Sequence, residues 1–394
     1  MMNFMRMIKP CDVAIIGAGL VGASLAAALM PSRLSVALVE PRAPVPPMDA
    51  WDSRIYALSP GSAAFLADVG AWQAVDAQRT ERVEAMRIFG DETSAQLHFS
   101  AYEAGLRELA FIVESGRLQT ALWQCVSRPS QLEIHCPAKC EALVQHADHV
   151  DVALDTGATL EAKLVVAADG AQSWVREQVG IKVIAHDYAQ SAVVANFSCG
   201  LPHQGTAYQW FRADGVLALL PLPGNRVSMV WSTSDGNARD LLALDAAALA
   251  ARVCAACDGV LGALDIVTPA AAFPLRLQRV ETFVKPRLAL VGDAAHNVHP
   301  LAGQGVNLGF RDARELAAVL CDRGAQNDCG DIALLRRYER ARKEDVLSMQ
   351  LATDGLQKLF ASPAVWLSRA RNSGLRFVDG QPFIKHLLVK HAVA

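Results

Sequence analysis

A short run near the N-terminus has the residue types of a phosphate-binding turn. Between a strand candidate at residues 12–16 and a helix candidate at residues 23–30, the chain reads Gly17-Ala18-Gly19-Leu20-Val21-Gly22. Gly17 permits a tight bend, Gly19 lets the backbone approach a pyrophosphate, and Gly22 allows the helix to pack on the strand. Free N–H groups at the helix N-terminus attract phosphate. The run predicts a dinucleotide site, and a glycine turn used only for close packing is the alternative interpretation.

An acidic residue completes this motif. Residues 34–40 form a second strand candidate that ends in Glu40, about 20 residues beyond the glycines, as the dinucleotide fingerprint requires. A carboxylate at this position accepts hydrogen bonds from ribose hydroxyl groups. Because FAD and NAD both carry an adenosine ribose, this half of the site does not distinguish them.

A second glycine-rich run lies far along the chain. It follows the apolar strand candidate Arg287–Val291 and leads into a helix candidate from about Val306 to Cys321. Its candidate cofactor-binding positions are Gly292, Asp293, Pro300, Gly303, Gln304, Gly305, Val306 and Asn307. Asp293 at a strand end can accept a hydrogen bond from a polyol such as ribityl, and a glycine-rich helix start directs N–H groups at an anion. Reduced flavin carries such a negative charge on its ring, at N1 and the C2 carbonyl. The nicotinamide ring of NAD offers no such group, so the second run favours FAD.

Together these runs resemble the class A FAD-dependent aromatic monooxygenases, the para-hydroxybenzoate-hydroxylase-like family, and within it the hydroxylases of ubiquinone biosynthesis. The resemblance extends over nearly the whole chain. Besides the two glycine-rich runs, it includes the segments Asp52–Ser59, Val113–Gln119, Ala168–Arg176, Trp210–Arg212 and Ala218–Pro223. The chain departs from the family pattern at Ser115-Gly116, where an Asn-Arg-type pair is expected.

The resemblance also implies roles for individual residues at the two ends of the cofactor. The residues expected to hold the ADP half of FAD are Gly17, Gly19, Gly22 and Glu40. Asp293 is expected to bind the ribityl chain or the pyrophosphate, and Pro300 to pack near the flavin ring.

Three further residues have a functional and a structural interpretation. Arg54 is expected beside the flavin, where a cation stabilises charged flavin states, and the alternative is a surface ion pair. Arg117 is expected at the FAD diphosphate. Asp169 follows the strand candidate at residues 164–168 and is expected to support FAD and the pyridine nucleotide, unless it only closes a strand-end turn.

Two histidines near Asp293 raise the question of a metal. His296 and His299 could join Asp293 as ligands. However, a His-x-x-His spacing followed by proline does not place two ligands on one helix face. We therefore expect no metal site.

The resemblance implies hydroxylation of an electron-rich ring. Reduced FAD would react with O₂ to give a flavin C4a-hydroperoxide, and a polyprenyl phenol would accept the hydroxyl group. Because the cofactor performs the difficult step, the protein mainly excludes water and favours the phenolate. Candidates for a catalytic side chain are Arg54, Tyr188, Tyr208, His186 and Arg212, and packing explains the last four equally well. NAD(P)H as the reductant is implied by the resemblance alone, because the sequence shows no second Rossmann unit that would bind it.

Composition limits the class of protein. The 394 residues are 52% apolar and 20% charged with a net charge of −3, which excludes disorder and argues against a nucleic-acid binder. Nine cysteines, an odd number in a long chain, indicate free thiols and a reducing, cytoplasmic compartment. The apolar stretch at residues 11–30 predicts a strand and a helix rather than a membrane span, because Asp12 and three glycines interrupt it.

The order of strand and helix candidates predicts an α/β fold. We expect a Rossmann-like FAD-binding domain with an inserted antiparallel-sheet substrate domain and a C-terminal helical segment. A single helix is expected at residues 240–256 of the substrate domain. The expected divisions are residues 1–79, 108–184 and 281–330 for the FAD-binding domain, 80–107 and 185–280 for the substrate domain, and 331–394 for the C-terminal region.

The C-terminal region carries an excess of basic residues between positions 366 and 394. On a helix, the apolar residues that share one face are Phe383, Ile384, Leu387 and Leu388. We hypothesise that this tail meets the inner face of a membrane or a partner protein, including a ubiquinone-biosynthesis complex. A helix packed on its own protein is the alternative, and an oligomer is a further possibility.

Other functions remain open at this point. A class A hydroxylase of a small soluble aromatic, a flavin-dependent double-bond reductase and an FAD-holding accessory subunit share the same cofactor motifs. A flavin-dependent halogenase is disfavoured because its Trp-x-Trp-x-Ile-Pro motif is missing from the sequence.

Overall fold

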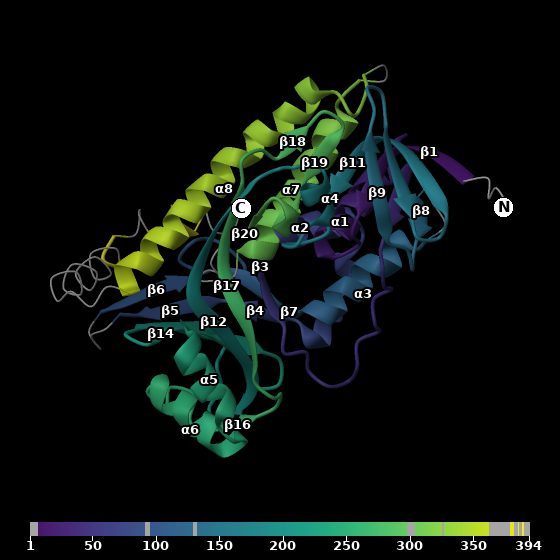
Figure 1. The fold of residues 1–394 in the computed structure, drawn as a ribbon. Helices are drawn as coiled ribbons and strands as arrows, with labels where there is room; N and C mark the ends of the chain where they lie inside the picture. Colours follow the sequence, from purple (N-terminus) through teal and green to yellow (C-terminus); the bar gives the residue numbers. More distant parts are fainter. Residues whose placement is uncertain are drawn as a thin grey trace.

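A computed structural model gives the fold. The residues it describes are 7–90, 95–128, 132–297, 304–324, 327–361, 379–381, 385, 388 and 389. They form three sheets and the helices that pack on them (Figure 1).

The first sheet has eight strands and a parallel centre. Its main path runs β18-β19-β11-β1-β2-β8, and β10 and β9 extend it from β11. The strand bounds are β1 Met7–Ile16, β2 Val36–Val39, β8 Leu132–His135, β9 Cys140–Gln145, β10 Val150–Leu154, β11 Ala158–Ala167, β18 Val284–Lys285 and β19 Leu288–Leu290. The central strands β1 and β11 pair in parallel and end in buried apolar residues, as expected for a sheet covered on both faces.

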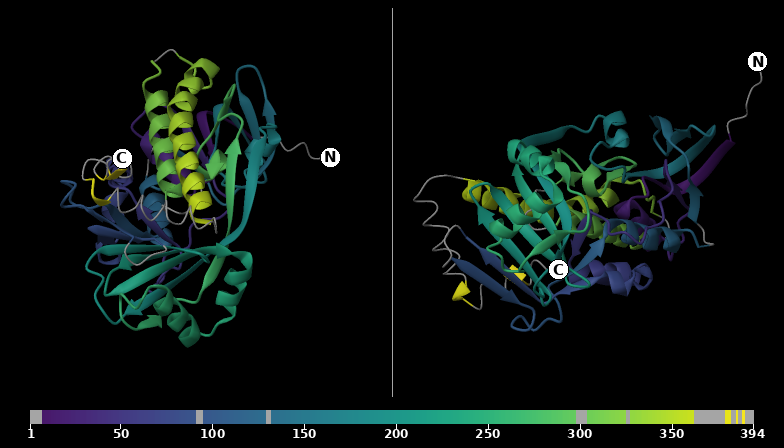
Figure 2. Two further views of the ribbon diagram at one scale, coloured as in Figure 1. Left: turned by 90° about the vertical axis from the view of Figure 1, so that its left-hand side faces the viewer. Right: turned by 90° about the horizontal axis from the view of Figure 1, so that it is seen from below.

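Helices from distant parts of the chain pack beside this sheet. Their bounds are α1 Leu20–Leu29, α2 Pro60–Asp68, α3 Ser115–Val126, α4 Trp174–Gln178, α7 Gly305–Cys321 and α8 Ile332–Ala361. Helix α1 contacts both α3 and α7, and α7 lies along α8 (Figure 2). The carboxyl ends of β1 and β19 and the start of α7 are therefore close in space although far apart in sequence.

The second sheet has nine strands. Its path runs β20-β17-β12-β15-β14-β13-β5-β6, with β16 paired to β12. The bounds are β5 Ala85–Phe89, β6 Gln96–Ser100, β12 Val183–Cys199, β13 Thr206–Arg212, β14 Gly215–Leu222, β15 Arg226–Ser234, β16 Leu264–Ile266, β17 Ala271–Val280 and β20 His296–Asn297. Its strands pair antiparallel except β13 with β5, which pair in parallel.

The two faces of this sheet have different neighbours. Helices α5, Asp235–Ala243, and α6, Ala246–Ala256, cover one face (Figure 1). The other face packs on a small sheet of β3 Ile55–Leu58, β7 Ala110–Glu114 and β4 Glu81–Val83, which joins it to the first sheet. The inserted antiparallel sheet and the Rossmann-like layer together confirm the predicted fold class.

The expected helix at residues 240–256 is wrong in one respect, because two helices occupy the region. Helix α5 ends at Ala243, and Asp245 then caps α6 by accepting a hydrogen bond from the Ala248 N–H at 2.8 Å. Because the Asp245 carboxylate satisfies a free backbone N–H, it favours the start of a new helix at this point. The alanine-rich composition concealed this break.

All nine cysteines are free thiols, as predicted. Burial raises the pKa of Cys11, Cys140, Cys199 and Cys329 to about 12, which keeps these thiols protonated and unreactive near neutral pH. Among the described residues, no helix is long and apolar enough to cross a membrane.

Candidate functional site

The first glycine turn is held by close packing at two of its three glycines. Gly17 has a φ of +101°, and a Cβ there would lie 2.4 Å from the Ala168 carbonyl oxygen. A Cβ on Gly22 would lie 1.9 Å from the Gly17 carbonyl oxygen. A Cβ on Gly19 would meet no atom within 4 Å. Packing therefore explains Gly17 and Gly22, whereas Gly19 borders open space that a ligand can approach.

Glu40 lies where the ribose motif predicts. At the end of β2, its Oε2 accepts a hydrogen bond from the Ala18 N–H at 2.7 Å, and the Gly17 N–H donates to the Val39 carbonyl at 2.8 Å. The carboxylate is thus fixed beside the glycine turn, and its second oxygen accepts a hydrogen bond from the nearby Arg42 N–H at 3.2 Å.

A residue that the sequence interpretation passed over also supports this turn. The Gln119 side-chain amide, from α3, donates to the Ala18 carbonyl at 2.6 Å. Gln119 belongs to the segment Val113–Gln119 that carried the family resemblance, but only Arg117 was singled out there. The sequence offered only a side-chain amide in this segment, which is a weak indication of a role. Its half-buried position on α3 is visible only in the fold.

The second turn presents Asp293 to solvent. Gly292 begins a short 3₁₀ turn, η3 Gly292–Ala294, with a φ of +59°. The Asp293 side chain is exposed, yet protein surrounds its carboxyl closely enough that desolvation raises its pKa, while His296 and Arg54 act in the opposite direction. An accessible carboxylate with cations nearby suits the predicted hydrogen bond to a ribityl hydroxyl.

The two turns meet through Val21. A Cβ on Gly292 would lie 3.0 Å from a Val21 methyl, and one on Gly309 would lie 2.5 Å from the same methyl. Glycine at these positions in η3 and α7 lets the first turn of α1 pack directly against them. Contact between α1 and α7 thus brings together the two halves of the predicted site (Figure 1).

The site has the unpaired groups that a dinucleotide would satisfy. Neither the N-terminus of α1 nor that of α7 has a side-chain cap, so both present backbone N–H groups and a positive dipole end. At the start of α7, the Gln304 Oε1 is buried and has no hydrogen-bond partner among the residues that the structure describes. With open space at Gly19 and carboxylates at Glu40 and Asp293, these residues fit FAD.

Arginines flank the site with different partners. The Arg117 Nε donates to Glu114 at 2.9 Å and its Nη1 contacts Asp76 at 3.3 Å, so its guanidinium is shared among protein carboxylates. Arg54 is exposed, lies 5.0 Å from the centroid of the Phe273 ring, and acts electrostatically on Asp293. Its position beside Asp293 favours the flavin-side interpretation of Arg54.

Asp169 and Asn307 serve local structure. The Asp169 Oδ2 accepts a hydrogen bond from the Val175 N–H at 3.0 Å in α4, and desolvation by burial raises the pKa of this carboxyl. The Asn307 side chain bonds to the Ser59 N–H and the Ala57 carbonyl, each at 2.9 Å. Asn307 thereby fastens the predicted segment 52–59 to α7.

Two catalytic candidates lie away from the cofactor motifs. Tyr208 is buried in the core between the second sheet and helices α5 and α6, stacked on Trp210. Arg212 donates to the Ala256 carbonyl at the end of α6 at 2.9 Å and to Asp214 at 3.0 Å. The structure gives both residues packing roles on the helix-covered face, and it does not bring them to the turns at Gly17 and Asp293.

Other predicted positions are less informative. Tyr188 is half-buried at a register shift in β12, and the His186 side chain lies outside the described residues. Pro300 and Gly303, with His299, also fall outside them, so the packing of Pro300 near the flavin ring stays a prediction.

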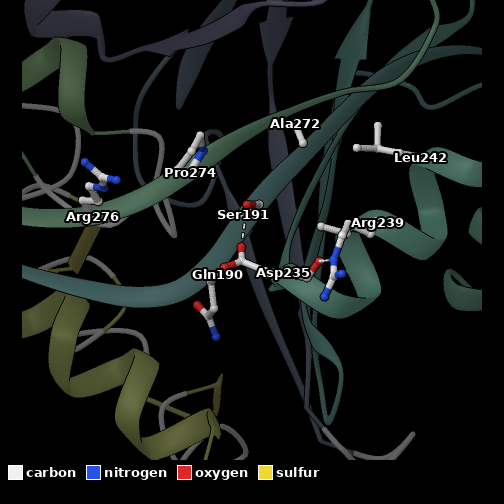
Figure 3. A pocket seen from close by; sticks show the side chains of 9 residues that line it. Gln190, Ser191, Asp235, Arg239, Leu242, Ala272, Pro274 and Arg276 are labelled. Atoms are coloured by element: carbon white, nitrogen blue, oxygen red, sulfur yellow. Dashed lines mark hydrogen bonds between the residues drawn. The ribbon is translucent and has the colours of Figure 1, made fainter.

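A cavity of about 350 Å³ lies on the same helix-covered face. Figure 3 shows Pro274 and Arg276 of β17 beside Ser191 of β12 and Asp235 of α5, with the Ser191 hydroxyl donating to Asp235 at 2.7 Å. Side chains alternate along β17, and Phe273 points to the opposite face, where it meets Arg54. This cavity is therefore separate from the cofactor site.

One cluster of metal-ligand residue types lies on the β9–β10 hairpin, away from both glycine turns. His146 and His149 both contact the Asp151 carboxylate, at 3.1 and 3.6 Å. Their rings stack with centroids 4.3 Å apart and planes 19° apart. Because a metal lies in the plane of each imidazole that binds it, nearly parallel stacked rings do not converge on one ion, and we interpret the cluster as surface ion pairs.

The comparisons with known proteins agree with this geometry. Residues 10–350 match the family described as FAD binding domain, and the chain belongs to that family. FAD is accordingly its cofactor.

Among curated relatives, the chain is 36% identical over 390 residues to the 3-demethoxyubiquinol 3-hydroxylase of Escherichia coli, covering 98% of this chain and 99% of that protein. It is 35% identical over 389 residues to the ubiquinone hydroxylase UbiL of Rhodospirillum rubrum, covering 98% and 90% of the two chains. Its fold is similar to that of PqsL, a probable FAD-dependent monooxygenase from Pseudomonas aeruginosa, with a TM-score of 0.78, 22% identity and coverage of 94% and 100%.

Proposed function

We propose that this chain is an FAD-dependent monooxygenase that hydroxylates the aromatic ring of a polyprenyl phenol in ubiquinone biosynthesis. The observation that carries the proposal is the 36% identity to a demethoxyubiquinol hydroxylase over 98% of this chain, with both FAD turns intact. When bound, FAD supplies the activation of O₂. The protein holds the cofactor, orients the phenol and excludes water.

The proposed FAD-binding roles follow from the geometry of the two turns. The N-terminus of α1 and the open backbone at Gly19 hold the diphosphate, and Glu40 accepts bonds from the adenosine ribose. Asp293 would accept a bond from the ribityl chain, and the uncapped N-terminus of α7 would offer backbone N–H groups to an anionic part of the cofactor. Arg54, beside Asp293, adds positive charge on the same side.

We further propose that the phenol lies between the second sheet and the flavin. This corresponds to the division into an FAD-binding domain of residues 1–79, 108–184 and 281–330, a substrate domain of residues 80–107 and 185–280, and a C-terminal region. The face of the sheet opposite α5 and α6 supports this proposal, because it packs toward β3 and β7 rather than toward helices. NAD(P)H is the proposed reductant.

A polyprenyl tail would place the substrate in a membrane, so we propose a peripheral position at its cytoplasmic face. Of the tail residues expected to share an apolar face, Phe383, Ile384 and Leu387 lie outside the described residues, and Leu388 is 46% exposed. Deletion of residues 381–394 tests this point, because unchanged recovery in the membrane fraction contradicts it.

The function is tested by deleting the gene and identifying the quinone intermediate that accumulates. We expect an intermediate that lacks one ring hydroxyl group, and its structure names the ring carbon. The wild-type gene should restore ubiquinone, whereas Asp293→Ala should not. In vitro, the purified protein should consume O₂ and NAD(P)H in a substrate-dependent manner. Normal ubiquinone in the deletion strain contradicts the proposal, and restoration by an Asp293→Ala protein that lacks FAD would favour an accessory role.

A further inference from the structure

A buried carboxylate lies directly beneath the turn that carries Asp293. Asp312, on the inner face of α7, has no exposed surface. Its Oδ2 accepts hydrogen bonds from the Gly292 N–H at 2.9 Å and from the His296 Nε2 at 2.6 Å. Gly292 precedes Asp293 and His296 follows it. This one oxygen of Asp312 therefore fixes the backbone before Asp293 and a side chain after Asp293.

The other carboxylate oxygen connects the turn to the C-terminal helix. The Arg342 Nε, from α8, donates to the Asp312 Oδ1 at 2.7 Å. The Arg342 Nη1 bonds to Asp345 at 2.6 Å, and its Nη2 reaches the Leu308 carbonyl at 3.4 Å. Arg311 also contacts Asp345, at 3.3 Å. The resulting network joins η3, β20, α7 and α8.

In this network the Asp312 carboxylate is paired with His296 and Arg342, and the Asp345 carboxylate with Arg342 and Arg311. Burial alone would raise the pKa of the Asp312 carboxyl, but His296 and Arg342 hold it below its usual range. An ionised carboxylate in the core is stable only when all its partners are present. Apolar residues would fill this part of the core more simply than paired charges. The network therefore serves to fix the positions of Gly292 and His296.

We propose that Asp312 is a positioning residue for FAD, which holds Gly292 and His296 so that Asp293 presents its carboxylate to the cofactor, with Arg342 anchoring Asp312 from α8. The inference rests on the binding of FAD at Asp293. Asp312 itself is covered by protein and does not touch the cofactor.

The test measures FAD affinity of the full-length apoprotein by the quenching of flavin fluorescence. Asp312→Asn retains the shape of the side chain but removes its charge and one acceptor oxygen. We expect its FAD dissociation constant to rise at least tenfold and the visible circular dichroism of the bound flavin to change. The control Asp345→Asn removes a charge from the same network without contacting η3 or β20, and its FAD affinity should stay within threefold of the wild type.

A second pair of variants separates positioning from general loss of stability. His296→Gln keeps a side-chain donor for Asp312, whereas His296→Ala removes it. If Asp312→Asn does not fold, this pair decides: a loss of FAD affinity in His296→Ala that is largely restored in His296→Gln supports the proposal. Equal affinities of these two variants, or an Asp312→Asn protein with wild-type FAD affinity, overturn it. A wild-type protein that binds no FAD would instead overturn the cofactor assignment.

Discussion

The two turns that meet at Val21 are built from different physical interactions. The first turn, at Gly17–Gly22, is fixed by contacts that leave no room for a Cβ and by hydrogen bonds to neighbouring backbone. The second, at Gly292–His296, is fixed by a buried carboxylate whose partners come from α7, β20 and α8. Close packing around glycine dominates the first turn, whereas paired charge, added to the packing of Gly292 on Val21, fixes the second.

This difference predicts how each turn responds to change. A sterically fixed turn should be intolerant of added volume. A turn fixed by paired charges should tolerate small changes of volume at its surface but depend on the protonation of its buried acid. Four experiments, in decreasing order of expected effect, test this contrast.

The largest effect is expected for Gly22→Ala. Its methyl group would lie 1.9 Å from the Gly17 carbonyl oxygen, a backbone atom that no side-chain movement can clear, so the turn must shift and the cost should exceed both the roughly 1–3 kcal/mol of ordinary overpacking and the cost of the next variant. We expect protein that is destabilised and purifies without flavin. Gly19→Ala is the matched control, because its methyl group meets no protein atom within 4 Å. It should fold normally and lose only FAD affinity, and equal loss of stability in both variants would contradict the steric contrast.

The next effect concerns acid stability through Asp312. Because its folded-state pKa lies below the ordinary value of about 3.9, ionisation stabilises the fold at higher pH, and this contribution is lost as pH falls from there through the folded pKa. Breaking such a buried pair costs about 3–5 kcal/mol near neutral pH. Urea unfolding at a series of pH values should show the gap between wild type and Asp312→Asn closing in acid. A gap independent of pH would refute paired charge as its origin.

A smaller effect is expected for Gln119→Ala. Removing the 2.6 Å hydrogen bond to the Ala18 carbonyl should cost about 0.5–1.5 kcal/mol and weaken FAD binding severalfold. Gln124→Ala, at an exposed position of the same helix α3, is the control and should leave FAD affinity unchanged. The same titration of apoprotein with FAD measures both, and indistinguishable affinities would remove Gln119 from the first turn's support.

The smallest effect on the cofactor is expected for Arg212→Gln. This change removes contacts to Ala256 and Asp214 on the helix-covered face, so stability should fall by about 1 kcal/mol while FAD content and turnover remain those of the wild type. Tyr208→Phe should behave similarly, because Tyr208 packs in the same core. A hundredfold loss of turnover in either variant would return that residue to the list of catalytic candidates.

The contrast between the turns also explains what could be predicted from the sequence. The glycines of the first turn and Glu40 lie close together in sequence, so their spacing already indicated its form, although its distant supports at Ala168 and Gln119 were not visible. The second depends on Arg342, which lies on another helix and carries no signal of its partner before the fold is known. Tyr208 and Arg212 illustrate the same limit, because the face of a strand that meets a cofactor depends on which face the helices cover. The division at Asp245 was missed because alanine favours helix on both sides of a capping residue.

The anchoring of Asp312 by Arg342 has a consequence for the order in which the protein matures during synthesis. Gly17 is made long before Asp312, and the second turn has its counter-charge from Arg342 only after α8 has been made. A nascent or prematurely terminated chain would hold an uncompensated buried carboxylate beneath Asp293. Chains that stop before α8 should therefore fail to retain flavin and remain open to proteolysis, so that cofactor loading reports a polypeptide that extends through α8.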